Sequence, residues 1–272
     1  MTYANFALLK NSNLLSHPAI QPNSDLPPAI GSNFIELATV DSTNNYAMAR
    51  VHEGLAFHGA AYFAHEQTLG KGQRGKSWIS KARENIILSI VLQPGFLQLS
   101  EQFMLNTAIV LGCYDFLKLF IQEEVFIKWP NDIYWRDRKA GGILIESICK
   151  GREWLFAIAG IGINLNQVDF SPDLPNPVSL KQITGQSFIP VDMARILCDC
   201  LEKTYSTLKR KNVSGLLSRY NEALYKRNQI VQLNHAGKLI QTKILEVNAQ
   251  GQLLTMDQMS RNFDLSEVQW LT

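Results

Sequence analysis

One short stretch of the chain combines three glycines with three cations. Residues 70–78 read Gly-Lys-Gly-Gln-Arg-Gly-Lys-Ser-Trp. Glycine lets a ligand come close to the backbone, and backbone N–H groups together with cations can bind a phosphate. The spacing fits neither the P-loop nor the dinucleotide-binding fingerprint. Taken alone, the stretch is therefore either a phosphate-binding loop or a solvated basic surface loop, which its final tryptophan returns to the core.

Two further stretches place a lysine where it could contact a ligand. Residues 128–132 read Lys-Trp-Pro-Asn-Asp, a pattern that predicts a strand ending in a sharp turn. Lys128 could lie beside phosphates, and Asn131 could bind a base or ribose because its amide both donates and accepts. Lys139 stands shortly before a double glycine that opens a buried strand, from which it could reach a reacting centre. A plain turn and a hairpin loop with charged tips are the respective alternatives.

Glycines also alternate with isoleucines in residues 160–164, which end in Asn164. A strand of this kind has one face without side chains, which suits a planar bicyclic ligand with Asn164 at its rim. A β-bulge with no ligand nearby explains the same glycines.

The elements that must position these residues alternate along the chain. Strands are predicted at residues 34–40, 60–64, 86–92, 125–129, 143–148 and 154–158, and short strands at 230–233, 240–247, 253–256 and 268–271. Helices are predicted at 44–51 after caps at 41–43, from Ser100 to 121, at 191–209 and at 216–225.

This order predicts an α+β fold. It consists of a mixed β-sheet catalytic domain flanked by helices, residues 34–227, and a small C-terminal β-barrel domain, residues 228–272. Residues 1–33, rich in Asn, Ser and Pro, are expected to form an irregular leader that is too short and too proline-broken for a helix-turn-helix.

Composition narrows the class of protein. The net charge is only +2 over 272 residues, so we expect no binding to nucleic acid or membrane through a general basic field. No apolar run approaches the roughly 18 residues that span a bilayer, and no secretory signal is visible, which favours a soluble cytoplasmic protein. The four cysteines lack metal-ligand spacing, so we expect reduced, mostly buried thiols and no metal site built from protein ligands.

The motifs, in this order, closely resemble those of the biotin–protein ligase family. The resemblance spans roughly residues 34–166. It rests on Asp41-Ser42-Thr43-Asn44, on Gln67 ahead of the 70–78 loop, on residues 128–132, on residues 138–146 and on residues 160–166.

The resemblance implies an enzyme that converts biotin and ATP, with Mg²⁺, into biotinyl-5'-AMP. It then transfers biotin to a lysine of the biotin carboxyl carrier domain of a carboxylase, and a homodimer is compatible with the family. The implied catalytic residues are Lys139, Lys71 and Arg74. The implied biotin-binding residues are Ser42, Thr43, Asn44, Gln67, Lys71, Gly72, Gln73, Lys139, Gly142, Gly160 and Gly162. The implied ATP- and adenylate-binding residues are Lys71, Arg74, Lys76, Trp78, Lys128, Asn131 and Asn164.

The sequence also departs from the family pattern. Lys71, Gln73 and Lys76 replace arginines of many members, which leaves fewer forked phosphate contacts. Some members carry an N-terminal DNA-binding domain, and residues 1–33 imply the ligase-only form. Two alternatives remain: a lipoate or octanoate–protein ligase or transferase of the same fold, although its Arg-Arg and Ser-Gly-Gly-Gly motifs are missing here, and a non-catalytic nucleotide-regulated binding module, which has no need for Lys139.

Overall fold

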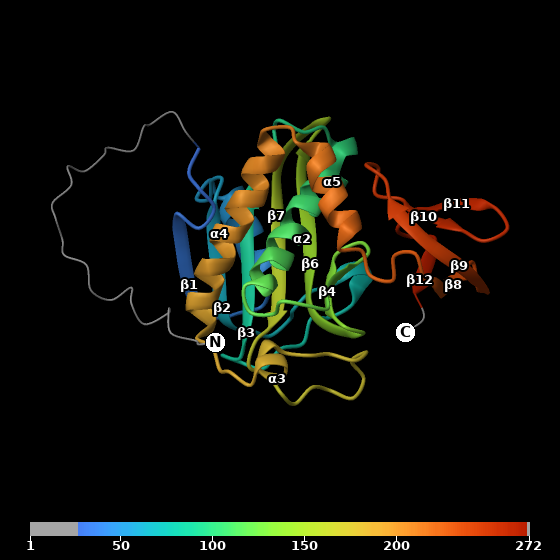
Figure 1. Cartoon of the computed structure of the whole chain (residues 1–272). Coiled ribbons are helices and arrows are strands. Elements are labelled where there is room, and N and C mark those ends of the chain that lie inside the picture. The colour runs from blue at the N-terminus through green and yellow to red at the C-terminus, as the bar shows by residue number, and fades with distance from the viewer. Residues whose placement is uncertain (1–26, 271–272) are drawn as a thin grey trace, which may run out of the picture.

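A mixed sheet forms the body of the molecule. The computed structural model describes residues 27–270, and its larger sheet has seven strands in the order β1-β2-β3-β7-β6-β5-β4 (Figure 1). Only β1 and β2 pair in parallel, and every other neighbouring pair is antiparallel. The strands are β1 (Asn33–Val40), β2 (Ala60–Gln67), β3 (Asn85–Leu92), β4 (Val125–Lys128), β5 (Asp132–Trp135), β6 (Arg138–Lys150) and β7 (Glu153–Asn164).

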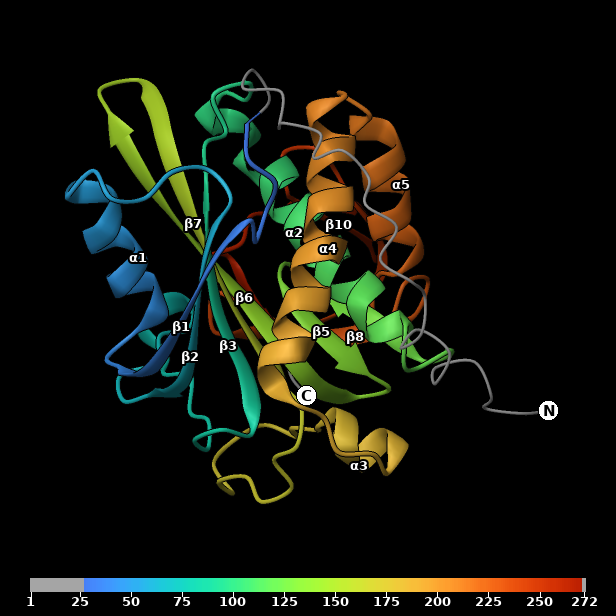
Figure 2. The same cartoon turned by 90° about the vertical axis from the view of Figure 1, so that its left-hand side faces the viewer.

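Helices cover both faces of this sheet. Figure 2 shows α1 (Thr43–His52) on one face, and α2 (Gln102–Lys118), α4 (Pro190–Lys209) and α5 (Val213–Glu222) on the other. The short helix α3 (Leu180–Thr184) and the single 3-10 turns η1 (Gln73–Gly75) and η2 (Leu99–Glu101) lie in the connections. Among residues 27–270, α1 is the one helix on its face of the sheet.

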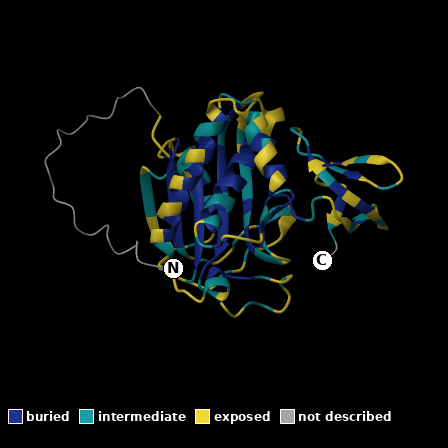
Figure 3. Cartoon of the chain, in the orientation of Figure 1, coloured by how far each residue is buried: buried dark blue, intermediate teal, exposed yellow. Residues whose placement is uncertain are grey.

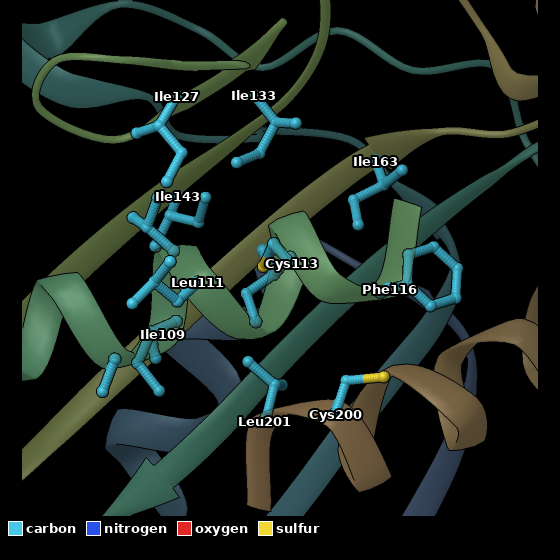
Figure 4. Packing of buried hydrophobic residues seen from close by; sticks show 14 of the residues in the cluster. Ile109, Leu111, Cys113, Phe116, Ile127, Ile133, Ile143, Ile163, Cys200 and Leu201 are labelled. Carbon is cyan, nitrogen blue, oxygen red and sulfur yellow. The ribbon is translucent and has the colours of Figure 1, made fainter. Parts of the chain in front are cut away.

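Helix α2 forms the centre of the core. Most of its side chains are buried, because the sheet lies against one of its sides and α4 against the other (Figure 3). In Figure 4, Leu111 and Cys113 lie between the isoleucines of β4, β5 and β6 and Leu201 of α4. This layered packing explains why α2 is apolar around its whole circumference rather than along one stripe.

The C-terminal unit is a five-stranded antiparallel sheet in the order β11-β10-β9-β8-β12. Its strands are β8 (Ile230–His235), β9 (Lys238–Val247), β10 (Leu253–Met256), β11 (Ser260–Phe263) and β12 (Val268–Trp270). It is joined to the main body by side chain–backbone hydrogen bonds. Trp129 Nε1 donates to the carbonyl of Gly251 over 2.9 Å, and Asn221 exchanges two bonds with the backbone of Val247.

The predicted fold class is confirmed, with differences at particular elements. Strand β5 was not predicted, and β6 begins at Arg138 rather than at residue 143, because the two strands form a hairpin that contains the charged stretch expected to be a loop. Ser100 does not cap the long helix, because the N-cap of α2 is Glu101 and Ser100 lies inside η2. Gln98 N donates to Glu101 over 2.8 Å as part of the capping box of η2. The domain boundary near residue 228 stays a prediction. Most of the predicted leader, residues 1–26, lies outside the described residues.

Two expectations from composition can be compared with the structure. Within residues 27–270, no helix is both long and apolar enough to cross a bilayer. All four cysteines are free thiols: Cys113, Cys198 and Cys200 are buried, and Cys149 is exposed.

Candidate active site

A cavity of about 410 Å³ opens beside the first turn of α1. The structure brings together there every residue for which the sequence predicted a role. These residues are Ser42, Thr43, Asn44, Gln67, Lys71, Gly72, Gln73, Arg74, Lys76, Trp78, Lys128, Asn131, Lys139, Gly142, Gly160, Gly162 and Asn164.

The basic loop is held in a narrow closed conformation at this cavity. Its two ends are bridged by backbone hydrogen bonds from Gly72 N to the carbonyl of Lys76, over 2.6 Å, and from Trp78 N to the carbonyl of Gly70, over 2.9 Å. Arg74 lies exposed near its tip with a positive φ of 56°. Lys71 Nζ donates to Asn45 Oδ1 over 2.5 Å, which ties the loop to α1. The loop therefore brings its cations to the cavity on a constrained backbone.

Lys139 is fixed in the cavity by an ion pair. Its Nζ lies 2.7 Å from Asp132 Oδ1, and both side chains are 27% exposed. Lys139 is the second residue of β6, paired with Tyr134 of β5, so a strand rather than a loop holds it. A Cβ on Gly142 would lie 3.3 Å from Lys139 Nζ, and the absence of a side chain there leaves space for the ion pair.

Lys128 lies among three aromatic rings. Its Nζ is 4.8 Å from the ring centroid of Tyr134, 5.9 Å from that of Tyr225 and 5.6 Å from that of Trp270. Burial lowers the pKa of Lys128 to about 8, although the carboxylate of Asp132 acts in the opposite direction. The rings compensate part of the lost hydration through cation–π contacts.

The sequence predictions missed several residues that line the cavity. Tyr134, Leu265, Val268 and Trp270 line the cavity, and the last three belong to the C-terminal unit. Trp270 was the one signal available in the sequence, but the pattern of residues 268–271 indicated only a strand.

The amide groups of the site are anchored to the backbone. Asn131 donates to the carbonyl of Ile143. Asn164 Nδ2 lies 3.1 Å from the carbonyl of Val178, to which it donates, and 3.4 Å from that of Lys139. Both side chains are almost fully buried, so each amide is oriented before a ligand arrives.

The alternating glycines of β7 accommodate protein side chains. A Cβ on Gly160 would lie 2.3 Å from Asn44 Oδ1, and one on Gly162 would lie 2.3 Å from Trp78 Cε2. These distances are far below van der Waals contact, so both positions require glycine for the present packing. The expected bare face is thus covered in part by Asn44 and Trp78.

The comparisons with known proteins first define a class. Residues 37–164 match the model of the Biotin/lipoate A/B protein ligase family, a range that contains all the residues for which roles were predicted. The fold agrees with a biotin protein ligase from Aquifex aeolicus, determined in complex with biotin and ATP. The two share a TM-score of 0.74 at 24% identity, over 88% of this chain and 98% of that one.

Relatives in sequence narrow this class. The chain is 33% identical, over 181 residues, to the biotin–[acetyl-CoA-carboxylase] ligase of Paracoccus denitrificans, covering 63% of this chain and 72% of that relative. It is 28% identical, over 228 residues, to the bifunctional ligase/repressor BirA of Escherichia coli, covering 82% and 69%. The chain belongs to the biotin–protein ligase family, and the resemblance seen in its motifs is confirmed. It spans between 54% and 69% of the length of the bifunctional ligase/repressors that it matches.

Proposed function

We propose that this chain is an ATP-dependent ligase that forms biotinyl-5'-AMP and transfers biotin to a specific lysine of a biotin carboxyl carrier domain. One observation carries the proposal. A single cavity contains the fixed cation Lys139, the constrained basic loop and, at the start of α1, a set of buried hydroxyl and amide groups. The named relatives and the structural neighbour support the same activity.

The first reaction joins two anions, and the site carries the positive charge that this requires. A carboxylate oxygen of biotin attacks the α-phosphorus of ATP, the bond to the bridging oxygen breaks, and pyrophosphate leaves. Lys139 would lie beside the carboxylate and the α-phosphate, while Lys71 and Arg74 of the loop would neutralise the remaining phosphate charge. Cations that are already in position stabilise the charge developing in the transition state without a further reorganisation.

The buried polar groups at the start of α1 would bind the ring system of biotin. The backbone N–H of Thr43 donates to Gln67 Oε1 over 2.8 Å, and Thr43 Oγ1 lies 3.3 Å from the same oxygen, so the Gln67 side chain is held against the first turn of α1. Ser42 precedes the helix as its N-cap, yet its side chain makes no capping hydrogen bond, and the residue lines the cavity although little of it is exposed. That hydroxyl is therefore available to a ligand.

ATP binding would involve further residues that line the same cavity. These residues provide cations, oriented amides and an aromatic surface, which suit phosphates, a ribose and a base. They are Lys76, Lys128, Asn131, Asn164 and Trp78. Mg²⁺ commonly binds through substrate phosphates together with one or two carboxylates. Asp132 is the one carboxylate among the lining residues described, and residues 27–270 contain no cluster of three metal-ligating side chains. A Mg²⁺ carried by the phosphates, with Asp132 beside it, fits this arrangement, and it would neutralise phosphate charge.

In the second reaction, the amine of the carrier lysine attacks the acyl carbonyl of the adenylate and AMP leaves. No covalent bond to the enzyme is needed, which agrees with the absence of a nucleophile–base pair among the residues assigned here. Homodimerisation through a sheet edge stays a prediction.

Incubation with labelled biotin, ATP and a biotin carboxyl carrier domain tests the proposal. We expect label on one lysine of the carrier, and none when that lysine is replaced by arginine. Transfer of lipoate or octanoate in place of biotin would support the related ligase or transferase. Nucleotide binding with neither adenylate nor transfer would support a binding module.

A further inference from the structure

A chain of hydrogen bonds leads from Glu146 of β6 to the cavity. Asn44 Nδ2 donates to Glu146 Oε2 over 2.7 Å. Ser89 Oγ, fully buried in β3, lies 2.6 Å from Asn44 Oδ1 and 2.8 Å from Thr43 Oγ1. Of these four residues, Thr43 and Asn44 line the cavity, whereas Ser89 and Glu146 do not.

The carboxylate at the far end of the chain determines the direction of each bond. An ionised carboxylate only accepts, so Asn44 must turn its NH₂ group towards Glu146. Asn44 Nδ2 also lies 3.4 Å from the carbonyl oxygen of Leu144, which is a second acceptor. Asn44 therefore turns its oxygen towards Ser89, and the single hydroxyl proton of Ser89 must go to that oxygen. Ser89 can then only accept from Thr43.

This arrangement determines the role of Thr43, because its hydroxyl proton is donated to an acceptor within the protein. Its neighbours are Ser89 Oγ and Gln67 Oε1, the latter 3.3 Å away, and both are acceptors for its proton. The Thr43 oxygen accordingly presents only lone pairs to the cavity. A ligand group at this position must carry an N–H or O–H.

We propose that Glu146, acting through Asn44 and Ser89, makes the Thr43 hydroxyl an obligatory acceptor and so selects ligands with an N–H at that position. The inference rests on the proposed function, for which the N–H belongs to the cyclic urea of biotin. Glu146 and Ser89 are positioning residues, because neither reaches the cavity. Asn44, expected from the resemblance to bind biotin, does line the cavity, but both of its amide protons and its oxygen have partners within the protein, so it links Glu146 to Ser89.

The substitution Glu146→Gln tests the direction of the chain with little change of shape. Glutamine can donate as well as accept, so the side-chain amide of Asn44 can rotate by half a turn and present its NH₂ group to Ser89. Ser89 can then donate to Thr43, and Thr43 can donate to the ligand. The probe is a biotin analogue in which one urea N–H is replaced by a ring oxygen, giving a cyclic carbamate. Binding of biotin and of each of its two carbamate isomers is measured by calorimetry without ATP.

We expect the wild type to bind one carbamate isomer at least about tenfold more weakly than biotin, since an unpaired buried acceptor replaces a hydrogen bond. In Glu146→Gln this ratio should fall about fivefold or more, with the KM for ATP unchanged. Ser89→Ala should also lower the ratio, because the nearer of the two acceptors for the Thr43 proton is removed. Glu153→Gln, an exposed carboxylate at the far end of β7, is the matched control and should keep the ratio of the wild type.

The two proposals can fail separately. Wild-type protein that binds no biotin contradicts the proposed function. Wild-type protein that binds biotin and discriminates against the carbamate, while Glu146→Gln and Ser89→Ala discriminate equally well, overturns the directed chain and leaves the ligase function intact. Melting curves of each variant establish that the compared proteins are folded.

Discussion

Replacing Lys128 by methionine should stabilise the protein while impairing its use of ATP. The pKa of Lys128 is lowered from an ordinary value of 10.5 to about 8, chiefly by burial. That difference corresponds to a cost of about 3 kcal/mol for keeping the ammonium charged in the folded state. The cation–π contacts with Tyr134, Tyr225 and Trp270 return roughly 1–2 kcal/mol of it. Methionine keeps the apolar contacts with the rings, so we expect a net stabilisation of about 1–2 kcal/mol.

The stabilisation should depend on pH in a defined direction. Because the folded pKa of Lys128 lies below the unfolded pKa, the unfolded chain binds more protons between pH of about 8 and 10.5. The free energy of unfolding of the wild type therefore increases relative to that of the variant as the pH rises through this window. Below pH of about 8 the cost is fully present, and near pH 10.5 the advantage of Lys128→Met should have largely disappeared.

Thermal unfolding followed by circular dichroism near neutral pH and in the alkaline window measures both effects. For a chain of this size, 1–2 kcal/mol corresponds to a rise in Tm of about 2–8 °C. Lys238→Met, at an exposed position of β9, is the control and should show no such rise or pH dependence. A Lys128→Met variant that melts below the wild type near neutral pH would refute the reasoning, because the aromatic surroundings would then more than compensate for burial of the charge.

Three further changes probe the site. Lys139→Ala should slow adenylate formation about 100- to 1000-fold with the fold retained, and a wild-type rate in pyrophosphate exchange would exclude Lys139 from the reaction. Arg74→Ala should release biotinyl-adenylate about ten- to a hundredfold faster, whereas Gln73→Ala should change release only slightly; equal off-rates in the two variants would mean that Arg74 does not hold the phosphate. Gly162→Ala should lower the free energy of unfolding by about 1–3 kcal/mol through overpacking against the neighbouring tryptophan, unlike Gly95→Ala, where a Cβ meets nothing within 4 Å.

The sequence predicted the members of the site better than their surroundings. Glycines, cations and amides in short motifs could be assigned to one cavity because the order of these motifs along the chain resembles that of the biotin–protein ligase family, whereas each motif alone left alternatives open. Strand β5 was missed because Asp132–Trp135 is only four residues long and follows a strong turn signal. The length of β6 was missed for a related reason: Arg138 and Lys139 suggested a loop, whereas pairing with β5 keeps them in a strand.

What local patterns could not provide is the set of contacts between distant segments. Trp270 is 142 positions from Lys128 along the chain, yet it contributes one wall of the aromatic surroundings of that lysine. Glu146 and Ser89 do not line the cavity, although other residues of their strands do, and a pattern of residue types shows no reason to connect either of them with Asn44. In both cases a predicted site residue depends on side chains that are distant in the sequence. A ring from the C-terminal sheet packs against the Lys128 ammonium, and a carboxylate three hydrogen bonds away sets the hydrogen-bonding direction of the Thr43 hydroxyl. The motifs therefore indicate which groups meet the ligand, whereas the fold decides in which protonation state and in which direction these groups act.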